Sequence, residues 1–475
     1  MKPDTRALKK LKRKYSKNPD DRGVALVKRL LLSYSPGWFV VWVLRKYFVK
    51  TDYKAARESI KFFQLSNRSY GADKIHQAQR LLMIALRLLG ARLPQSYVSL
   101  LRSALAGTLK DPTTRNSLSN SILSATKEVP VEIFDASNWY QLSRGLFSLG
   151  YFRAAWVARE NSLDLSISES LASDASATTL QRGIEAHLER CNFYEADAAI
   201  RHSTSRISTD RISEFGEYLS MMQCSIQRTF QYSKTMNNEA LRVFDNLVCG
   251  KTVAIVGLGL PTGEFGVEID SADVVMRPKF VGTENLPDPK FHGTRCDVAQ
   301  YNSISPIAIV SSESQTKKFL DFIKLIITTT ESVISPPTIR DVPVLNPKFE
   351  LPTYRSTAVS GMRLLRIAIL GKPISLKIYG YDFYTKIEMY DENIMKFYQR
   401  DGWMLGDWFL VGQKDYMRKF WTVNQFSAHD PVSNFCFAQN LYKAGLFEIE
   451  PYGMSILELT PYQYVERLEE MMGDW

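Results

Sequence analysis

Residues 251–277 read KTVAIVGLGLPTGEFGVEIDSADVVMR, and this stretch decides the fold of the C-terminal half. Residues 252–256 are apolar and β-branched, which predicts a buried strand of a parallel sheet. The turn that follows contains Gly257, Gly259 and Gly263. Glycines let the backbone turn sharply and approach a ligand, and their N–H groups are expected to bond anionic oxygen. A second predicted strand ends at Arg277, so the whole stretch predicts a nucleotide site.

The glycine turn by itself leaves two interpretations open. Its spacing is close to the dinucleotide fingerprint, in which an Asp or Glu about twenty residues later binds the ribose of NAD. Here Arg277 follows the second strand instead, and an arginine suits the 2′-phosphate of NADP, a sugar acid or a nucleotide phosphate. Arg277 could equally be a structural partner of Asp270 or Asp273. An NADP-dependent oxidoreductase therefore stays one of the hypotheses.

Three motifs in order resemble those of glycosyltransferase family 29, the sialyltransferases. Val256-Gly257-x-Gly259, residues 265–277 and His292-Gly293-Thr294-Arg295 are similar to the large sialylmotif. A second segment, which begins at Ser360-Gly361 and ends at Tyr379-Gly380, is similar to the small sialylmotif. The third, HDPVSN at residues 429–434, is similar to the very small motif, with Asn434 in place of the usual glutamate.

The resemblance implies a Rossmann-like, doubly wound α/β domain of the GT-A-variant type found in sialyltransferases. It implies inverting transfer of a sialic-acid- or Kdo-type keto sugar from a CMP-sugar to a glycan or glycolipid acceptor, with His429 as the general base. The donor site that we expect comprises Gly257, Leu258, Gly259, Gly263, Arg277, Lys279, Ser360, Gly361, Tyr379 and Gly380. Leu258 and Lys279 stand where the family has asparagines.

Physical chemistry favours an anion site at the same residues. Ser360 and Gly361 begin a predicted helix at 360–370, whose first N–H groups and dipole stabilise a carboxylate or phosphate. His429 has an ordinary pKa of about 6.5, which suits a general base, although a histidine before a helix can also be a cap or a structural group. We interpret His292 as a loop residue and Asp270 as a structural residue that holds its loop through backbone hydrogen bonds.

Composition predicts neither a metal nor a disulfide framework. No two aspartates stand two apart, as they do in transferases that hold a divalent ion for a diphosphate donor, so we expect metal-independent activity with the CMP-sugar as co-substrate and no other cofactor. The five cysteines show no Cys-x-x-Cys spacing, which favours a reducing compartment and a cytoplasmic protein.

The net charge of +10 lies at the N-terminus. Residues 1–50 contain fourteen lysines and arginines against three aspartates, whereas the other 425 residues contain 46 basic and 47 acidic side chains. The apolar runs after this basic start are shorter than the roughly twenty residues that span a bilayer. We expect contact with an anionic membrane surface at its inner face, or else a solvated basic arm, and no nucleic-acid partner.

The remaining sequence divides into two predicted domains, an all-α domain at 51–245 and an α/β catalytic domain at 246–475. Aromatic turns at Tyr70, Tyr151 and Phe193 suggest loose tetratricopeptide-type helix pairs, so a non-catalytic repeat scaffold with a nucleotide-binding domain is a further hypothesis. The predicted strands are 252–256, 273–276, 296–301, 306–310, 342–345 and 374–379. The predicted helices are 316–327, 360–370, 431–444 and 461–472, and the tryptophan-rich segment 382–428 is a lid or ordinary packing.

Overall fold

The computed structural model describes residues 97, 112–223, 231–232, 238–259, 261–280, 282, 286–301, 322–328, 342–348, 352–356, 358–386 and 430–473. The chain divides into two compact units, one of residues 1–162 with 472–475 and the other of residues 163–471. The predicted membrane-contacting segment 1–50, the aromatic turn at Tyr70 and the strand predicted at 306–310 lie outside the described residues.

The described part of the first unit is helical. It contains α7 (Pro112–Lys127), the 3₁₀ helix η1 (Val131–Ile133), α8 (Ala136–Leu149) and the first half of α9 (Phe152–Ser170). Asp135 caps α8 by accepting a 2.7 Å hydrogen bond from the Asn138 N–H. Helix α8 ends at Gly150, whose φ of 83° is the left-handed conformation that glycine adopts most easily. Two of the predicted aromatic turns open helices as expected, since α9 begins at Phe152 and α11 begins at Phe193.

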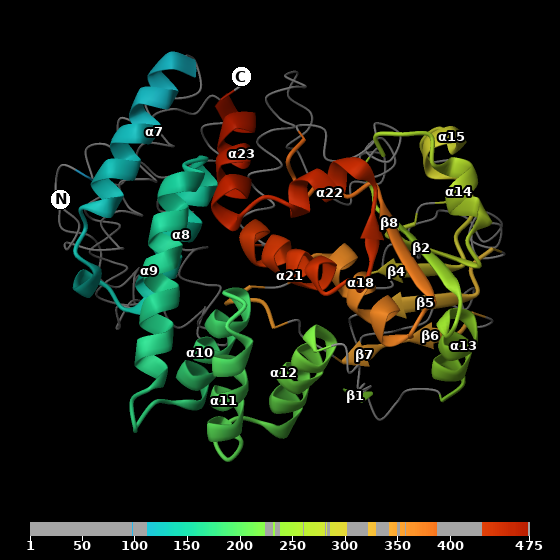
Figure 1. Cartoon of the computed structure of the whole chain (residues 1–475), viewed down its shortest axis with the longest axis horizontal. Coiled ribbons are helices and arrows are strands. Elements are labelled where there is room, and N and C mark those ends of the chain that lie inside the picture. The colour runs from blue at the N-terminus through green and yellow to red at the C-terminus, as the bar shows by residue number, and fades with distance from the viewer. Residues whose placement is uncertain are drawn as a thin grey trace, which may run out of the picture. The chain divides into compact units, whose positions relative to one another are not determined.

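The second unit combines helices with a sheet (Figure 1). Its N-terminal helices are α10 (Ala177–Glu189), α11 (Phe193–Ser203), α12 (Thr209–Met222) and α13 (Asn238–Val248). Both α10 and α12 contact α21 (Pro431–Lys443), which belongs to the C-terminal part of the chain. These contacts place the helices in the same compact unit as the sheet, the unit of residues 163–471.

A seven-stranded sheet with parallel pairing throughout forms the α/β part. Its strands are β2 (Thr252–Val256), β3 (Val274–Pro278), β4 (Val298–Tyr301), β5 (Leu325–Thr328), β6 (Val344–Leu345), β8 (Ser375–Tyr379) and β9 (Glu448–Ile449), in the spatial order β6-β5-β4-β3-β2-β8-β9. The chain therefore builds outward from β2 on one side and returns to build β8 and β9 on the other. Strands β1 (Gln231–Tyr232) and β7 (Pro347–Lys348) form a separate antiparallel pair.

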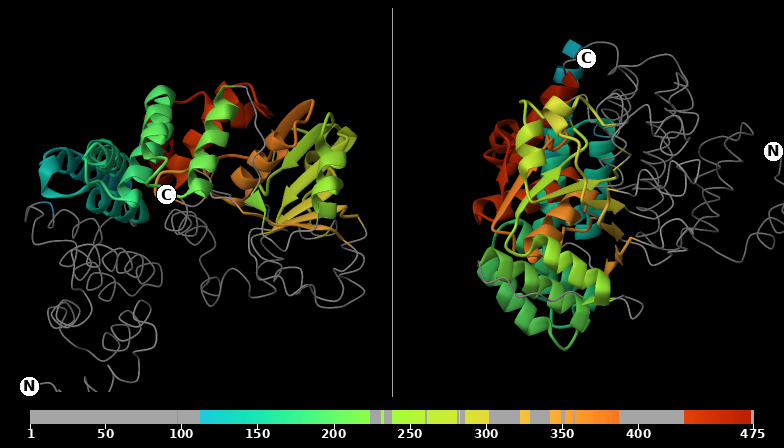
Figure 2. Two further views of the ribbon diagram at one scale, coloured as in Figure 1. Left: turned by 90° about the horizontal axis from the view of Figure 1, so that it is seen from below. Right: turned by 90° about the vertical axis from the view of Figure 1, so that its right-hand side faces the viewer.

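Helices lie on both sides of this sheet (Figure 2). Helix α14 (Gly266–Ser271) places Ile269 in a core cluster with Ala254, Val256, Val275 and Tyr379. Helix α18 (Ser360–Leu370) contacts β2, β3 and β4 from the other side, and nine of its residues are buried. The other helices among the described residues are α15 (Pro289–His292), α22 (Pro451–Leu457) and α23 (Pro461–Gly473). Burial on both faces explains why β3 is apolar along its whole length except at Arg277.

Most predicted elements are confirmed, with one error. The strands predicted at 252–256 and 374–379 correspond to β2 and β8, and the helices predicted at 360–370 and 461–472 correspond to α18 and α23. The predicted helix at 316–327 is wrong at its end, where residues 325–328 form β5. The run Leu-Ile-Ile-Thr is buried between β4 and β6, and its β-branched side chains suit a central strand better than a helix.

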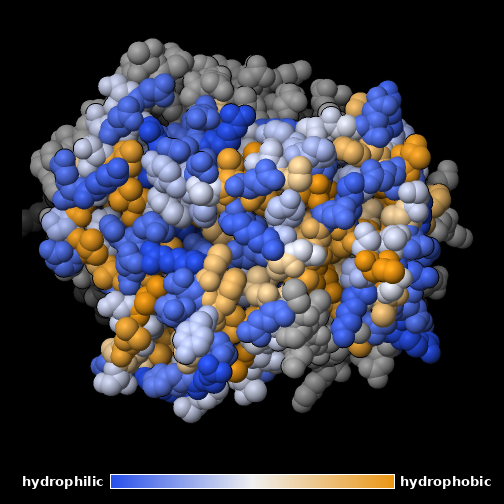
Figure 3. Space-filling model, in the orientation of Figure 1, coloured by the Kyte–Doolittle hydropathy of each residue, from blue (hydrophilic) through white to orange (hydrophobic). Residues whose placement is uncertain are grey.

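The surface shows no single apolar stripe on the face in Figure 3, where hydrophilic and hydrophobic residues alternate over short distances. Large apolar side chains that are exposed, such as Leu171, Tyr194 and Val267, belong to separate elements. Scattered exposed apolar residues are normal for folded proteins. No helix among the described residues is both long enough and apolar enough to cross a membrane.

Candidate functional site

A cleft with about 830 Å³ of empty space, including its open mouth, lies at the carboxyl ends of β2, β3 and β8. This is the point at which the strand order reverses, and open α/β sheets bind ligands at such switch points. The cleft is lined by Leu258, Gly259, Pro278, Lys279, Val359, Ser360, Gly361, Met362, Gly380, Tyr381, Asp382, Phe383, Tyr384, Pro431, Asn434 and Tyr464. Six of the predicted donor-binding residues are therefore brought together here: Leu258, Gly259, Lys279, Ser360, Gly361 and Gly380.

The glycine turn after β2 packs directly against the turn after β8. The Gly257 N–H donates to the Tyr379 carbonyl at 2.8 Å, and the Gly259 N–H donates to the Gly380 carbonyl at 3.2 Å. A Cβ at Gly257 would meet the Gly380 carbonyl at 2.4 Å, and one at Gly380, whose φ is 66°, would meet the Gly259 carbonyl at 2.4 Å. These two N–H groups therefore already have partners, contrary to our expectation that they bind anionic oxygen. Glycine at these positions instead allows the two turns to pack closely together.

The start of α18 brings Ser360 and Gly361, the residues of the predicted anion site, to the wall of the cleft. Its N-cap is Val359, which forms no side-chain capping hydrogen bond. The Gly361 Cα packs against Tyr381, because a Cβ there would lie 2.0 Å from the Tyr381 hydroxyl oxygen. This N-terminus lines the cleft together with Lys279, Tyr381 and Tyr384, and its helix dipole contributes a positive potential there.

The third motif is held against the second by Asn434. Its Oδ1 accepts a 2.9 Å hydrogen bond from the Val359 N–H, and its Nδ2 donates to the Asp430 carbonyl at 2.7 Å. Asp430 caps α21 by accepting from the N–H groups of Val432 and Ser433. Asn434 and Pro431 line the cleft, whereas His429, the predicted base, lies outside the described residues. The structure thus brings the residues that follow His429 to the cleft.

Glu450 is a site residue that sequence reasoning missed. Its buried carboxylate accepts the Gly380 N–H at 2.7 Å through Oε1, and the Thr262 N–H and hydroxyl at 2.9 and 3.1 Å through Oε2. Glu450 therefore ties the glycine turn after β2 to the turn after β8. The only signal in the sequence is an acidic residue directly before Pro451, which is also the pattern of an ordinary helix start.

Arg277 and His292 lie beneath the turn and not in the cleft. The buried Arg277 guanidinium donates through Nε to the Arg295 carbonyl at 2.7 Å and through Nη2 to the His292 carbonyl at 2.5 Å. Burial lowers the Arg277 pKa to about 10. The His292 Nε2 lies 2.8 Å from the Gly259 carbonyl, which can only accept, so Nε2 carries the hydrogen. These contacts favour the structural interpretation of Arg277 over a ligand-binding one.

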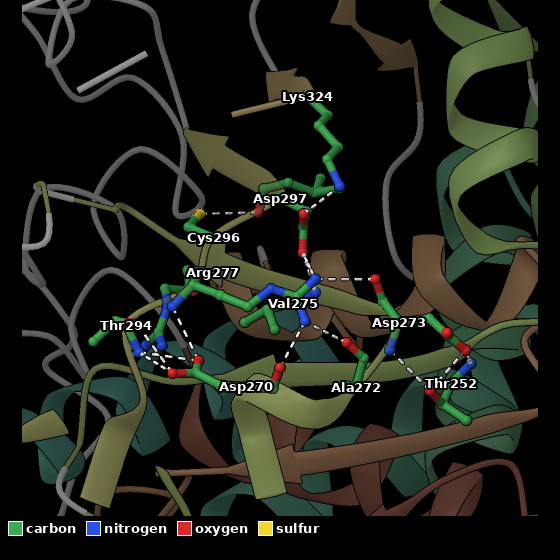
Figure 4. Close-up of polar contacts among 12 residues, drawn as sticks. Thr252, Asp270, Ala272, Asp273, Val275, Arg277, Thr294, Cys296, Asp297 and Lys324 are labelled. Carbon is green, nitrogen blue, oxygen red and sulfur yellow. Dashed lines mark hydrogen bonds and ion pairs between the residues drawn. The ribbon is translucent and has the colours of Figure 1, made fainter. Parts of the chain in front are cut away.

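Asp270 has the structural role that we expected. Its carboxylate accepts from the Thr294 N–H at 2.9 and 3.0 Å, from the Thr294 hydroxyl and from the Arg295 N–H at 3.0 Å (Figure 4). Arg295 in turn donates to Asp297, which also accepts from Lys324 and from the Val275 N–H. This network fixes the segment that follows α15 under the glycine turn, and His292 is the buried last residue of that short helix and not the loop residue that we expected.

Lys279 brings a cationic group to the cleft from the end of β3. Its φ of 51° is left-handed, and its N–H donates to the Gln300 carbonyl at 2.7 Å. Burial lowers the Lys279 pKa to about 8. Phe383 and Tyr384, with φ values of 50° and 66°, also line the cleft in left-handed conformations. Such conformations cost roughly 1–2 kcal/mol per residue and concentrate at functional sites.

Besides Gly257 and Arg277, two more of the predicted donor-binding residues do not line the cleft. Tyr379 is buried on the α14 side of the sheet, where its ring centroid lies 5.5 Å from that of Phe265. Gly263 lies close to the Phe265 ring, since a Cβ at Gly263 would be 2.9 Å from the nearest carbon of that ring. The aromatic cluster around Phe265 therefore belongs to the core.

Within the described residues no group of three His, Cys, Asp or Glu side chains is arranged to hold a metal ion.

Comparisons of the chain with protein-family models, with curated proteins and with solved structures find no significant match. The function of the cleft is accordingly argued from its geometry and from the motifs that line it.

Proposed function

We propose that the chain is a sialyltransferase-like glycosyltransferase that moves a sialic-acid- or Kdo-type sugar from a CMP-sugar donor to a glycan acceptor. The observation that carries the proposal is that segments of all three motifs line one cleft. Leu258 and Gly259 belong to the first motif, Ser360, Gly361 and Gly380 to the second, and Pro431 and Asn434 to the third. When motifs that are far apart in the sequence line one cleft, a single ligand that contacts all of them is the simplest explanation.

The charges in the cleft suit the proposed donor. The α18 N-terminus and Lys279 supply positive potential on one wall, which fits the phosphate of CMP and the carboxylate of an acidic sugar. In the proposed reaction the acceptor oxygen attacks the anomeric carbon while the bond to the phosphate oxygen breaks, and CMP leaves. His429 takes up the acceptor proton as this bond forms. The expected class of fold is then the sialyltransferase-like GT-A variant.

Release of CMP from a panel of CMP-activated sugar acids in the presence of glycan acceptors tests the proposal. We expect CMP release from at least one donor, and a loss of about 10²–10⁴-fold for His429→Ala. His202→Ala, at an exposed position of α11, is the matched control and should keep full activity. A panel in which no donor reacts, or a fully active His429→Ala protein, would contradict the assignment.

Two rival functions are separated by ligand binding. Arg277, the residue that suited the 2′-phosphate of NADP, is engaged by two carbonyl groups, which counts against the oxidoreductase. Stronger thermal stabilisation by NADP than by CMP or CTP would favour it nevertheless. CMP binding without turnover of any donor would favour the non-catalytic scaffold. EDTA should leave transfer unchanged, because a monophosphate leaving group needs less charge neutralisation than a diphosphate.

The proposal includes a cytoplasmic enzyme whose residues 1–50 contact an anionic membrane surface. Their charge of fourteen basic against three acidic residues supports this. Flotation of the full chain with vesicles of anionic lipid should be strong at low salt and weak at high salt. Equal flotation with neutral vesicles would contradict the electrostatic anchor.

A further inference from the structure

Asp382 brings to the cleft a carboxyl group that none of the motifs accounts for. It lies two residues after Gly380, at the carboxyl end of β8, and is one of the residues that line the cleft. Its Oδ1 accepts a 2.9 Å hydrogen bond from the Tyr384 N–H. Its Oδ2 is buried and has no hydrogen-bond partner among the described residues. A buried carboxylate oxygen without a donor is costly, so this oxygen calls for a partner, and a ligand in the cleft can supply one.

The backbone around Asp382 is held in one conformation. The Asp382 carbonyl accepts from the Thr385 N–H at 3.0 Å and from the Thr385 hydroxyl at 2.5 Å. The next two residues, Phe383 and Tyr384, are left-handed, and the Tyr464 hydroxyl fixes the Phe383 carbonyl at 2.6 Å. Strained backbone of this kind persists where the surroundings determine it fully, and it is frequent at ligand sites. The turn therefore presents the carboxyl group rigidly.

The groups around Asp382 favour a titration near neutral pH. Burial raises its pKa to about 6; the hydrogen bond from Tyr384 and the charge of Lys386 oppose this rise, and the charge of Glu450 adds to it. Among the described residues, the titratable groups on the surrounding elements also include Lys279 after β3, Tyr381 and Tyr384 after β8, Asp430 and Cys436 at α21, Tyr452 on α22 and Tyr464 on α23.

We propose that the Asp382 carboxylate binds a sugar hydroxyl in the cleft, either of the ribose or of the transferred sugar. This inference rests on the proposed function and adds a contact to it. An ionised carboxylate only accepts hydrogen bonds, so its partner must be a donor. It also repels the phosphate and the carboxylate of the donor, which then lie toward the α18 N-terminus and Lys279. Hydroxyls are the neutral donors that the ribose and the transferred sugar of a CMP-sugar both carry, and we assign one of them, in preference to the cytosine amino group, to Asp382.

Calorimetric titration with cytidine tests the contact, because cytidine carries hydroxyls and no group that titrates near pH 6. We expect wild-type affinity to be higher at pH 7.5 than at pH 5, and Asp382→Asn to bind about tenfold more weakly at pH 7.5 with little dependence on pH. Asp174→Asn, in an exposed loop, is the matched control and should bind as the wild type does. If 2′- or 3′-deoxycytidine loses no further affinity in Asp382→Asn, the ribose is the partner.

Steady-state kinetics with the CMP-sugar test whether the hydroxyl belongs to the transferred sugar. If Asp382→Asn binds cytidine normally but raises the KM for the CMP-sugar, the hydroxyl belongs to the transferred sugar. Unchanged cytidine affinity together with unchanged donor kinetics overturns the inference. If wild type binds uridine or adenosine and not cytidine, the cytidylyl assignment fails. In that case the same comparison of wild type with Asp382→Asn, made with the nucleoside that binds, tests the Asp382 contact. If the wild type binds none of these nucleosides, both proposals are overturned.

Thermal unfolding separates a ligand contact from a structural role. The folded pKa of Asp382 lies above its ordinary value of 3.8, so the group lowers stability as pH rises from about 4 to 6, and this penalty persists above pH 6. Asp382→Asn should therefore unfold at a temperature about 2 °C or more above that of the wild type at pH 7.5, with a smaller difference at pH 4.5. A lower unfolding temperature at pH 7.5 would show that the carboxylate is structural and overturn the inference.

Discussion

At the scale of single residues, several positions in the cleft require glycine because a Cβ would collide with neighbouring atoms. Gly361 is the clearest case, because a Cβ would lie 2.0 Å from the Tyr381 hydroxyl oxygen and 2.3 Å from its ring. We expect Gly361→Ala to displace Tyr381 or the first turn of α18. The free energy of unfolding should fall by about 1–3 kcal/mol and CMP affinity by about tenfold. Urea unfolding and calorimetry measure the two effects.

Gly216 provides the control for this substitution. It lies within α12, and a Cβ at this position would have no heavy atom within 4 Å. Gly216→Ala should stabilise the protein by about 0.5–1 kcal/mol through helix propensity and leave CMP binding unchanged. Equal effects of the two substitutions would mean that the contact with Tyr381 does not matter.

His292 gives a residue-scale prediction for pH. Burial lowers its pKa to about 4, and the positive charge of Arg277 adds to this, while the hydrogen bond to the Gly259 carbonyl opposes it. The unfolded chain takes up a proton near pH 6.5 and the folded chain does not. The titration of His292 therefore leaves stability unchanged above pH 7, and it lowers the free energy of unfolding progressively as pH falls from 6.5 to 4, by about 3 kcal/mol in total.

The variant His292→Gln isolates this effect, since glutamine can donate to the same carbonyl but does not titrate. The difference in unfolding free energy between wild type and variant should be constant above pH 7 and shift against the wild type at lower pH. His202→Gln, at an exposed site, should show no such trend. A flat difference between pH 7 and 4 for His292→Gln would sink the prediction.

At the scale of elements, β2 and β8 are coupled beyond their strand pairing. The register from Thr252 with Ser375 to Val256 with Tyr379 continues into the two turns, whose ends Glu450 joins. Glu450→Gln replaces one acceptor oxygen by an NH₂ group that opposes a backbone N–H. We expect a loss of about 1–3 kcal/mol of stability and weaker CMP binding. Glu458→Gln, at an exposed position of the same C-terminal region, should change stability by less than about 0.5 kcal/mol.

The variant Glu450→Asp distinguishes the bridge that Glu450 forms between the two turns from an effect of its negative charge alone. Glu450→Asp keeps the charge, but its shorter side chain cannot reach both Thr262 and Gly380. It should therefore resemble the glutamine variant in CMP affinity. Wild-type affinity in Glu450→Asp would show that charge, and not the bridge between the turns, matters.

Element types were predictable where one pattern dominated. The strand before Gly257 and the helix after Val359 have apolar runs and clear start signals, and both are found within one residue of the prediction. Strand β5 was missed because residues 316–327 also have apolar residues at helical spacing. A short buried strand and a buried helix segment cannot be separated by spacing alone; the neighbours β4 and β6 decide.

At the scale of the whole molecule, the helices before the sheet are linked to the cleft. Arg366 on α18 and Glu217 on α12 form a buried ion pair, with an Nε–Oε1 distance of 2.7 Å and side-chain exposures of 4% and 1%. Glu217→Gln leaves the buried guanidinium without this carboxylate and should cost about 3–5 kcal/mol. The double change Glu217→Leu with Arg366→Met should recover most of it, because an apolar pair avoids the desolvation of two charges.

An exposed ion pair is the control for this prediction. Arg201 and Asp197 on α11 are 67% and 35% exposed, and Asp197→Asn should cost less than about 1 kcal/mol. Urea unfolding followed by several probes would check that α12 and the sheet unfold together. Separate transitions would contradict the single compact unit of residues 163–471.

The sequence by itself determined the parallel α/β sheet, the strand and glycine turn at 252–259, the helix at 360–370 and the loop role of Asp270. These depend on local apolar spacing, on turn residues and on short-range hydrogen bonds, all of which are visible along the chain. Only the tertiary structure decided that Arg277 is occupied by carbonyl groups, that Glu450 joins two turns, and that Asp382 lies in the cleft. Each of these depends on which distant segments meet at the switch point of the sheet, and long-range pairing of that kind has no signal in local sequence.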